Sequence, residues 1–126
     1  MEAYNRRVWA IRGATTVSSD DPALIDEAVG ELISLIYKEN NFSEEDVVFT
    51  LFSQTSDLRS RNAAAAARRN GFSTHSPLFC VQEAEIDGML ERAIRVMIEV
   101  EKDNMDSPKM IYLRGASGLR PDLKRN

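Results

Sequence analysis

Two side chains that could take part in a reaction, those of Cys80 and Glu83, stand close together in the stretch Leu78-Phe79-Cys80-Val81-Gln82-Glu83. The stretch is mostly apolar, holds the single cysteine of the chain and ends in a carboxylate. A second run, Ala93-Ile94-Arg95-Val96-Met97, begins ten residues after Glu83 and carries an arginine. A strand that presents Cys80 and Glu83 at its end, followed by a helix that carries Arg95, would frame a polar pocket.

Three further residues could bind an anion or a polar ligand. Arg12 ends a short apolar run and precedes a glycine, and its guanidinium is a fork-shaped donor for a carboxylate or a phosphate. Tyr112 stands between two apolar residues, and Arg68 lies in an alanine-rich segment. Each candidate also has a simpler interpretation. Arg12 and Arg68 could be surface charges, Glu83 a solvated acid, Tyr112 a half-buried strand aromatic and Cys80 a small buried hydrophobe.

The familiar catalytic motifs are missing from the sequence. It contains no phosphate-binding glycine loop, no dinucleotide fingerprint and no paired cysteines with metal-ligand spacing. The single histidine, His75, lies in a Ser/Thr/Pro segment without the partners that a metal site or a Ser-His-Asp site needs. We therefore expect neither a metal nor a cofactor, and any reaction must use arginines, a carboxylate, a tyrosine and a thiol.

Length and charge limit the class of protein further. The 126 residues predict a single domain over 1–126, and the net charge of −4 argues against a general nucleic-acid binder. One cysteine fits a reducing compartment. No apolar run has the length of a membrane span, and the first residues lack the apolar core of a secretory signal. We expect a cytoplasmic protein with no nucleic-acid or membrane partner, an N-terminal extension over 1–7 and a mobile C-terminal tail over 115–126.

The pattern of residues predicts seven elements that alternate between strands and helices. Short β-branched and aromatic runs predict strands at 8–11, 47–52, 78–83 and 110–113. Apolar periodicity, capping residues and a run of five alanines predict helices at 22–40, 58–70 and 89–103. This order indicates an α+β (or α/β-like) domain with a mixed sheet of four or five strands and helices mostly on one face. The uncovered face predicts self-association.

The predicted third helix places Arg95 in solvent. On a helical wheel, one face is apolar and comprises Met89, Leu90, Ala93, Met97 and Val100. Arg95 falls on the opposite face with Glu91, Glu99 and Lys102. Periodicity by itself thus predicts a solvated arginine rather than a pocket residue.

Considered together, the candidate residues form a pattern that no single one of them shows. Five segments occur in the order and approximate spacing of one family: Ile11-Arg12-Gly13-Ala14-Thr15-Thr16, Cys80-Val81-Gln82-Glu83, Ile94-Arg95-Val96-Met97, Tyr112-Leu113 and Leu119-Arg120-Pro121-Asp122-Leu123. From about Val8 to Leu123 the chain resembles the small monofunctional chorismate mutases of the AroH class, the trimeric Bacillus-type enzymes. The resemblance implies a homotrimer that forms a pseudo α/β-barrel, with helices outside and active sites between subunits.

The resemblance also implies a reaction and a role for each residue. Members of this family convert chorismate to prephenate in phenylalanine and tyrosine biosynthesis, by an intramolecular Claisen rearrangement that needs no proton transfer. Arg95 would be the cation beside the breaking ether oxygen, and Arg12 would bind a substrate carboxylate. Glu83 would accept a hydrogen bond from the ring hydroxyl, with Cys80 nearby, and Tyr112 would orient the enolpyruvyl carboxylate.

Three more residues receive roles from the resemblance at the edge of the pocket. Arg68 matches an arginine on the pocket rim, and Arg120 would close over the site with Leu119 beside it. One departure stands at the start of the second helix, where the family commonly carries Phe-Pro and this chain has Asn62-Ala63. One wall of the pocket therefore differs from the family pattern.

A second class of function is a non-catalytic trimeric binder of an anionic metabolite on the same fold. Such a binder would be expected to lack some of the family's functional side chains. All five principal ones are present: Arg12, Glu83, Arg95, Tyr112 and Arg120. This favours the enzyme. An arginine-rich surface for RNA conflicts with the acidic balance of the chain.

Overall fold

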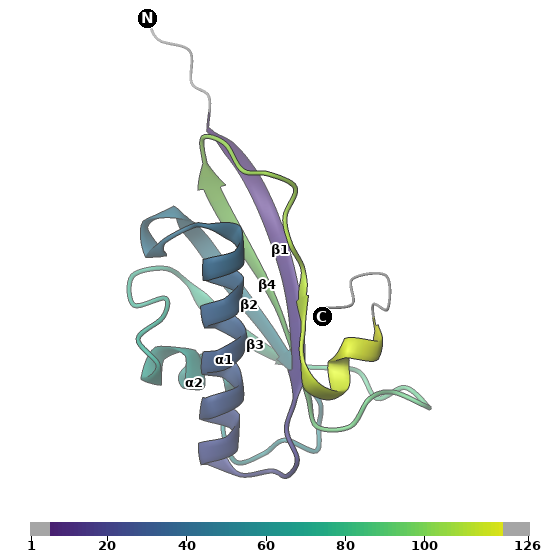
Figure 1. The fold of residues 1–126 in the computed structure, drawn as a ribbon. Coiled ribbons are helices and arrows are strands. Elements are labelled where there is room, and N and C mark those ends of the chain that lie inside the picture. Colours follow the sequence, from purple (N-terminus) through teal and green to yellow (C-terminus); the bar gives the residue numbers. More distant parts are fainter. Residues whose placement is uncertain (1–5, 120–126) are drawn as a thin grey trace, which may run out of the picture.

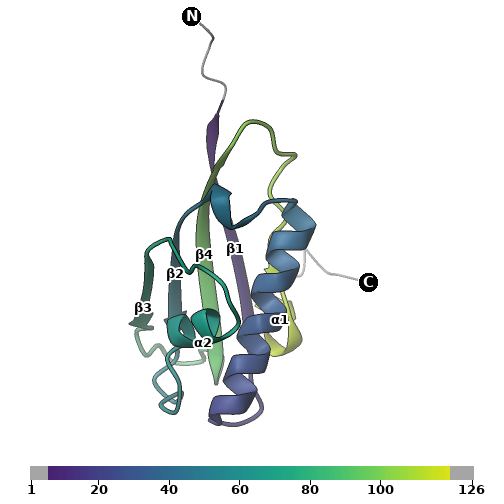
Figure 2. The same cartoon turned by 90° about the vertical axis from the view of Figure 1, so that its left-hand side faces the viewer.

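The computed structural model describes residues 6–119 and contains one mixed five-stranded sheet with both α-helices on one face (Figures 1 and 2). Its spatial strand order is β3-β2-β4-β1-β5. In chain order the elements are β1 (Arg7–Thr16), α1 (Pro22–Asn40), the 3-10 helix η1 (Glu44–Asp46), β2 (Val47–Gln54), α2 (Ala63–Arg69), β3 (Leu78–Gln82), β4 (Ala93–Lys102), β5 (Ile111–Tyr112) and the 3-10 helix η2 (Arg114–Leu119). The predicted fold class is confirmed.

Strand β4 lies at the centre of the sheet. It pairs antiparallel with β1 along its whole length and antiparallel with β2 on its other side. Strands β3 and β5 add in parallel at the two edges, on β2 and β1 respectively. One continuous register row crosses all five strands: Val81, Ser53, Arg95, Ala14 and Tyr112. Because residues in register point to the same face, this row sets the middle of the open face.

Helix α1 covers most of the other face and begins where its capping residues predict. The Asp21 carboxylate accepts hydrogen bonds from the backbone N–H groups of Ala23 and Leu24, and Pro22 occupies the first turn. The helix ends at Asn41, which adopts a left-handed conformation with φ of 51°. The predicted helix over 22–40 is therefore confirmed. Its buried apolar residues lie against β1 and share one core cluster with the buried side chains of β4.

Helix α2 is shorter than the predicted range of 58–70. Asn62 is its N-cap, with a side-chain oxygen that accepts from Ala64 and Ala65 N–H groups. The residues before it form a loop that Asp20 holds, through the backbone N–H groups of Arg59 and Ser60. The helix begins at Ala63, directly after the cap that Asn62 provides.

The predicted helix over 89–103 is wrong, since Ala93–Lys102 forms strand β4. Within this segment Ile94, Val96, Ile98 and Val100 are buried, and the residues between them face the other way. That is a period of two in β-branched residues, which fits a pleated strand better than a helix. The helical wheel places methionine, leucine and alanine residues on one face and does not reveal this alternation. Arg95 therefore projects from a central strand.

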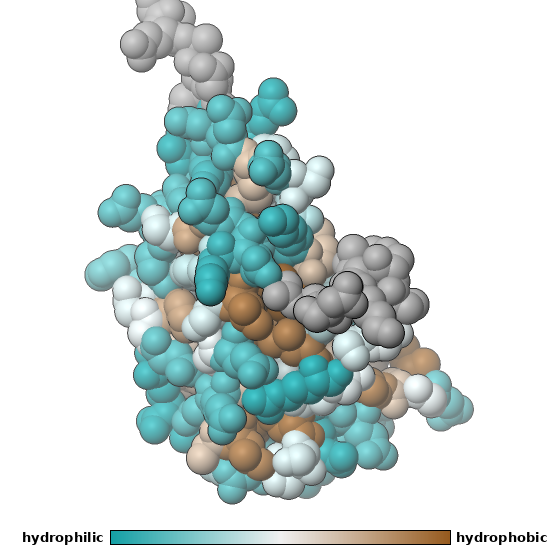
Figure 3. All heavy atoms as spheres, in the orientation of Figure 1, coloured by the Kyte–Doolittle hydropathy of each residue, from teal (hydrophilic) through white to brown (hydrophobic). Residues whose placement is uncertain are grey.

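The open face of the sheet carries exposed apolar side chains beside charged ones. Phe79 is 67% exposed, and Val81, Leu51 and Met97 also remain accessible. By contrast, the side seen in Figure 3 is mostly hydrophilic, with apolar side chains in a narrow band near its middle. No helix within residues 6–119 is both long and apolar enough to cross a bilayer.

Candidate active site

The centre of the candidate site is an ion pair on the open face. Glu83 follows β3 directly, and its backbone N–H donates to the carbonyl oxygen of Gln54 at 2.9 Å. Its carboxylate Oε1 lies 2.6 Å from Nε of Arg95. The hydroxyl of Ser53 donates to the same oxygen at 2.9 Å. The Glu83 side chain is only 14% exposed, so this pair is shielded more than a surface ion pair.

A second arginine stands on the same face one strand away. Arg12 is opposite Met97 in the register of β1 and β4, whereas Arg95 is opposite Ala14. The two arginines are therefore diagonal neighbours on adjacent strands. They border a shallow pocket of about 180 Å³ that Leu51, Ser53, Val81, Val96 and Met97 also line. With two guanidinium groups and one carboxylate, the pocket favours a ligand with negative charge.

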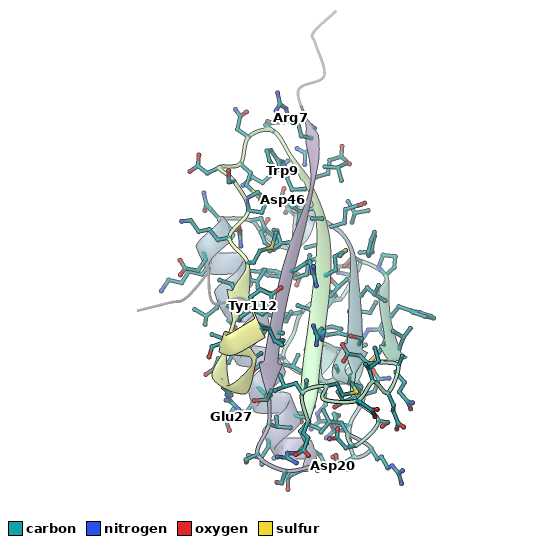
Figure 4. All side chains as sticks on the ribbon, turned by 90° about the vertical axis from the view of Figure 1, so that its right-hand side faces the viewer. Arg7, Trp9, Asp20, Glu27, Asp46 and Tyr112 are labelled. Atoms are coloured by element: carbon teal, nitrogen blue, oxygen red, sulfur yellow. The ribbon has the colours of Figure 1, made fainter. Side chains whose placement is uncertain are left out.

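Tyr112 lies in the same register row as Arg95, with Ala14 between them. Its ring is 7% exposed and packs in a small cluster with Ala14, Ala116, Leu90 and Met110. Figure 4 shows it beside β1, immediately before η2. Ala14 lies between Tyr112 and Arg95 in this row, and its side chain is only a methyl group, so little bulk separates the two larger residues. The structure thus brings four predicted residues, Arg12, Glu83, Arg95 and Tyr112, to one face.

The thiol of Cys80 lies on the other side of the sheet. In the parallel register Cys80 is opposite the buried Phe52, and its Sγ donates to Oε1 of Gln54 at 3.2 Å. Burial raises the pKa of this thiol, against the opposing effect of nearby backbone N–H groups of Ala63 and Ala64. Within one chain the Cys80 side chain therefore does not join the Arg95 cluster.

The backbone of Cys80 has a different orientation from its side chain. The carbonyl of Pro77 accepts from Thr50, and the N–H of Glu83 donates to Gln54, so odd-numbered residues of β3 bond to β2. In a parallel pair the intervening residues direct their N–H and C=O groups away from the neighbour. Cys80 thus presents backbone polar groups at the sheet edge, beside the carboxylate that follows.

Two other predicted site residues, Arg68 and Leu119, are not brought to this cluster by the single chain. Arg68 is exposed on α2, on the helix side of the sheet. Leu119 is 37% exposed at the end of η2, where it lines a separate hollow with Thr16, Val17 and Arg92. Arg120 lies outside the described residues. The predicted tail over 115–126 begins within η2.

The sequence pattern does not indicate Ser53 and Gln54, because the strand it predicts ends at residue 52. In the structure β2 extends through Gln54, so Ser53 reaches the open face two residues after Leu51. Gln54 faces the helices and uses both ends of its side-chain amide. Its Nε2 donates to the carbonyls of Leu58 and Arg61, and its Oε1 accepts from the Ala63 N–H at 2.8 Å. Extending the predicted strand by two residues, with the same alternation, would have placed Ser53 on the open face and Gln54 on the helix side.

Metal ions have no evident place in this site. Among the described residues, no group of three or more His, Cys, Asp or Glu side chains could hold a metal ion. The polar groups gathered around Arg95 on the open face are two guanidinium groups, one carboxylate, one hydroxyl and one phenol, and Glu99 and Glu101 lie further along the same face of β4. The group around Arg95, with its apolar rim, suits a small anionic ligand.

Comparisons with known proteins identify the family. The family model described as chorismate mutase type I matches residues 8–123. The chain is 40% identical to chorismate mutase AroH of Bacillus subtilis over 117 residues, which cover 92% of each chain. It is 39% identical to chorismate mutase AroH of Thermus thermophilus, over 93% of this chain and 97% of that protein. The chain belongs to the chorismate mutase type I family.

A solved structure agrees with this assignment. The fold superimposes on a chorismate mutase from Clostridium thermocellum with a TM-score of 0.80 and 39% identity. The match covers 86% of this chain and 96% of the other. The predicted family and the predicted enzyme class, an isomerase of the chorismate mutase type, are confirmed. The alternative of a non-catalytic binder finds no support among these relatives.

Proposed function

We propose that this chain rearranges chorismate to prephenate on the open face of its sheet, with Arg95 as the cation beside the breaking ether oxygen. The observation that carries this proposal is the placement of Arg95 on the central strand, next to Glu83 and diagonal to Arg12. The rearrangement breaks one C–O bond and forms one C–C bond without transfer of a proton. A site built from arginines and a carboxylate suits a reaction that needs no general base.

The sheet supplies the rigidity that such a mechanism needs. Charge develops on the ether oxygen as its bond lengthens, and a donor stabilises it best when it is already in place. Arg95 projects from a strand that is hydrogen-bonded on both sides, and its Nε is held by Glu83. Since that contact uses Nε, the terminal nitrogens of the guanidinium can meet the ether oxygen and a carboxylate of the substrate.

The remaining groups would bind the rest of the substrate. Arg12 takes one carboxylate, and Tyr112 orients the enolpyruvyl carboxylate from the far end of the same register row. Glu83 accepts a hydrogen bond from the ring hydroxyl. Holding a folded substrate in this way removes the entropy cost of reaching the reactive conformation.

The working site belongs to a homotrimer, with each pocket between two subunits. Support comes from the shallow pocket, from the exposed apolar side chains of Leu51, Phe79, Val81 and Met97 beside it, and from the positions of Arg68 and Cys80. A neighbouring subunit that covered the open face could bring its own α2, its β3 edge and its C-terminal segment to the pocket. Arg68, the Cys80 backbone, Leu119 and Arg120 would then contribute to the pocket. We place this assembly in the cytoplasm, in accord with its single cysteine.

The direct test is to mix the purified protein with chorismate and follow the loss of its ultraviolet absorbance, with prephenate identified chemically. We expect saturable turnover without any added metal or cofactor. Sedimentation equilibrium on the same sample should give the mass of three chains. An inactive, folded trimer would overturn the catalytic proposal, and a fully active monomer would overturn the location of the site between subunits.

A further inference from the structure

Ser53 occupies the centre of the pocket floor without a role in the mechanism above. It stands between Val81 of β3 and Arg95 of β4 in the register row and is one of the residues that line the pocket. Its neighbour Phe52 points to the helices and is fully buried. The alternation of β2 therefore directs the Ser53 hydroxyl to the open face, beside the Arg95–Glu83 pair.

One carboxylate oxygen of Glu83 receives two contacts. The Ser53 hydroxyl donates to Oε1 at 2.9 Å, and Nε of Arg95 lies 2.6 Å from the same atom. The arginine contact is an ion pair rather than an aligned hydrogen bond, because no N–H of suitable direction joins the two atoms. The serine contact is the directional one. It therefore decides how the carboxylate is turned.

Strand β2 holds Glu83 at two points. The carbonyl of Gln54 accepts from the Glu83 backbone N–H, and the adjacent Ser53 holds the carboxylate. This double attachment does not depend on Arg95. When the Arg95 guanidinium turns toward a ligand, a carboxylate held only by Arg95 would move with it, whereas one held by Ser53 stays in place.

We propose that Ser53 is a positioning residue, which keeps the Glu83 carboxylate oriented toward the substrate while Arg95 serves the ether oxygen. The inference rests on the proposed function, because it assigns Ser53 a task in the same pocket. Serine suits the position because its hydroxyl reaches Glu83 and its small volume leaves room for the ligand. It acts through Glu83 and need not touch the substrate.

The test is a double-mutant cycle between Ser53→Ala and Glu83→Ala, measured as kcat/KM with chorismate. A hydrogen bond to a charged group contributes enough that Ser53→Ala should lower kcat/KM about 10- to 100-fold. Ser53→Thr, which keeps the hydroxyl, should recover most of that loss. In the Glu83→Ala background, where no side-chain acceptor remains for the Ser53 hydroxyl, Ser53→Ala should change kcat/KM by less than about 2- to 3-fold, since the interaction between the two residues is already lost.

Ser60→Ala is the matched control. The Ser60 hydroxyl donates to the Asp20 carboxylate at 2.7 Å, in a loop outside the pocket, so the change removes the same type of bond elsewhere. It should leave kcat/KM unchanged in both backgrounds. If Ser53→Ala does not fold, Ser53→Cys retains the size with a weaker donor and replaces it in the cycle.

The outcomes separate this inference from the proposed function. Equal losses from Ser53→Ala in both backgrounds, or no loss in the wild-type background, would overturn the role of Ser53 alone. A Glu83→Ala enzyme with unchanged kcat/KM would overturn the role of Glu83 and with it that of Ser53. Absence of turnover in the wild-type protein would instead overturn the proposed function.

Discussion

The two faces of the sheet are built from the same strands and serve opposite purposes. In β4 the even-numbered residues Ile94, Val96 and Ile98 are buried under the helices, while Arg95 and Met97 project to the open face. The covered face contains large aliphatic side chains and stabilises the fold through their burial. The open face mixes charged and exposed apolar groups, which a stable monomer would not need.

Strand alternation puts core residues and candidate site residues at adjacent positions of the same strand. Adjacent residues such as Phe52 and Ser53 face opposite sides of the sheet, so their substitution should change different properties of the protein. Substitutions on the covered face should reduce the free energy of unfolding. Substitutions on the open face should affect turnover or assembly and leave the fold intact.

The largest expected effect is that of Arg95→Ala on turnover. Loss of one preorganised donor at a developing oxyanion costs about 2.7–4 kcal/mol, so kcat/KM should fall by at least about 100- to 1,000-fold. Arg95→Lys should recover little, because the fork-shaped guanidinium is lost. The unfolding midpoint should change little in either variant, as measured by urea denaturation.

Arg59→Ala is the control for this prediction. Arg59 is exposed, and its hydrogen bond to Asp20 comes from the backbone, so the side chain can be removed without disturbing the loop. This variant should have wild-type kinetics. Near-normal turnover of Arg95→Ala would show that the open face does not carry the chemistry as proposed.

Phe52→Ala should have the complementary effect on the covered face. Phe52 is fully buried in the main core, and removal of such a ring costs about 3–5 kcal/mol of unfolding free energy. Phe52→Leu, which keeps most of the volume, should lose clearly less. Urea denaturation at a fixed protein concentration measures both. A Phe52→Ala protein as stable as wild type would contradict the assignment of this face as the core.

Phe79→Asp tests whether the open face is covered in the assembly. Phe79 is 67% exposed in the single chain, and an unpaired carboxylate buried in an interface costs several kcal/mol. Sedimentation should then show the mass of one chain, with circular dichroism unchanged and turnover reduced. Ser34→Asp adds the same charge to the exposed side of α1 and should leave the assembly intact. A trimeric Phe79→Asp protein would place the interface elsewhere.

Asn62→Ala should have a moderate effect on stability. The Asn62 side chain caps α2, and loss of such a cap costs about 0.5–2 kcal/mol, typically near 1. Asn62→Asp keeps a capping oxygen and should remain close to wild type. Thermal unfolding monitored by circular dichroism distinguishes the two. Equal destabilisation by both changes would mean that the amide group has a task other than the cap.

The smallest effect concerns the reactivity of Cys80. Burial raises the pKa of its thiol, so a smaller fraction is thiolate at a pH of about 8 than in an unfolded chain. Alkylation by iodoacetamide should therefore be several-fold slower in the folded protein than in urea, and its rate should rise at higher pH than usual. Equal rates in both states would show that the side chain is not held on the covered face.

Parts of the fold follow from local signals in the sequence. Asp21 and Pro22 mark the start of α1, and the start of β2 at Val47 follows from its β-branched residues. The five segments of the family pattern indicated Arg12, Glu83, Arg95 and Tyr112, which the structure places on one face. The role of each remains a proposal.

Other parts could not be reached in this way. The segment of β4 predicts a helix, because its alanine, leucine and methionine stripe fits a helical wheel as well as its β-branched residues fit a strand. The sequence predicts a longer helix α2 than the structure has, because Asp20 and Gln54, which hydrogen-bond to the residues before and at its start, are distant in the chain. Ser53 was overlooked because its partner Glu83 is 30 residues away in the chain.

The sequence by itself determined the family, the boundaries of α1 and the set of polar residues available for chemistry, because caps, motifs and composition act over a few neighbouring residues. Only the tertiary structure decided which of those residues share a face. That choice depends on strand register, since a shift of one residue would exchange the buried and open sides of every strand. Arg95 next to Glu83 is the result of that register, and periodicity within its own segment pointed to solvent instead.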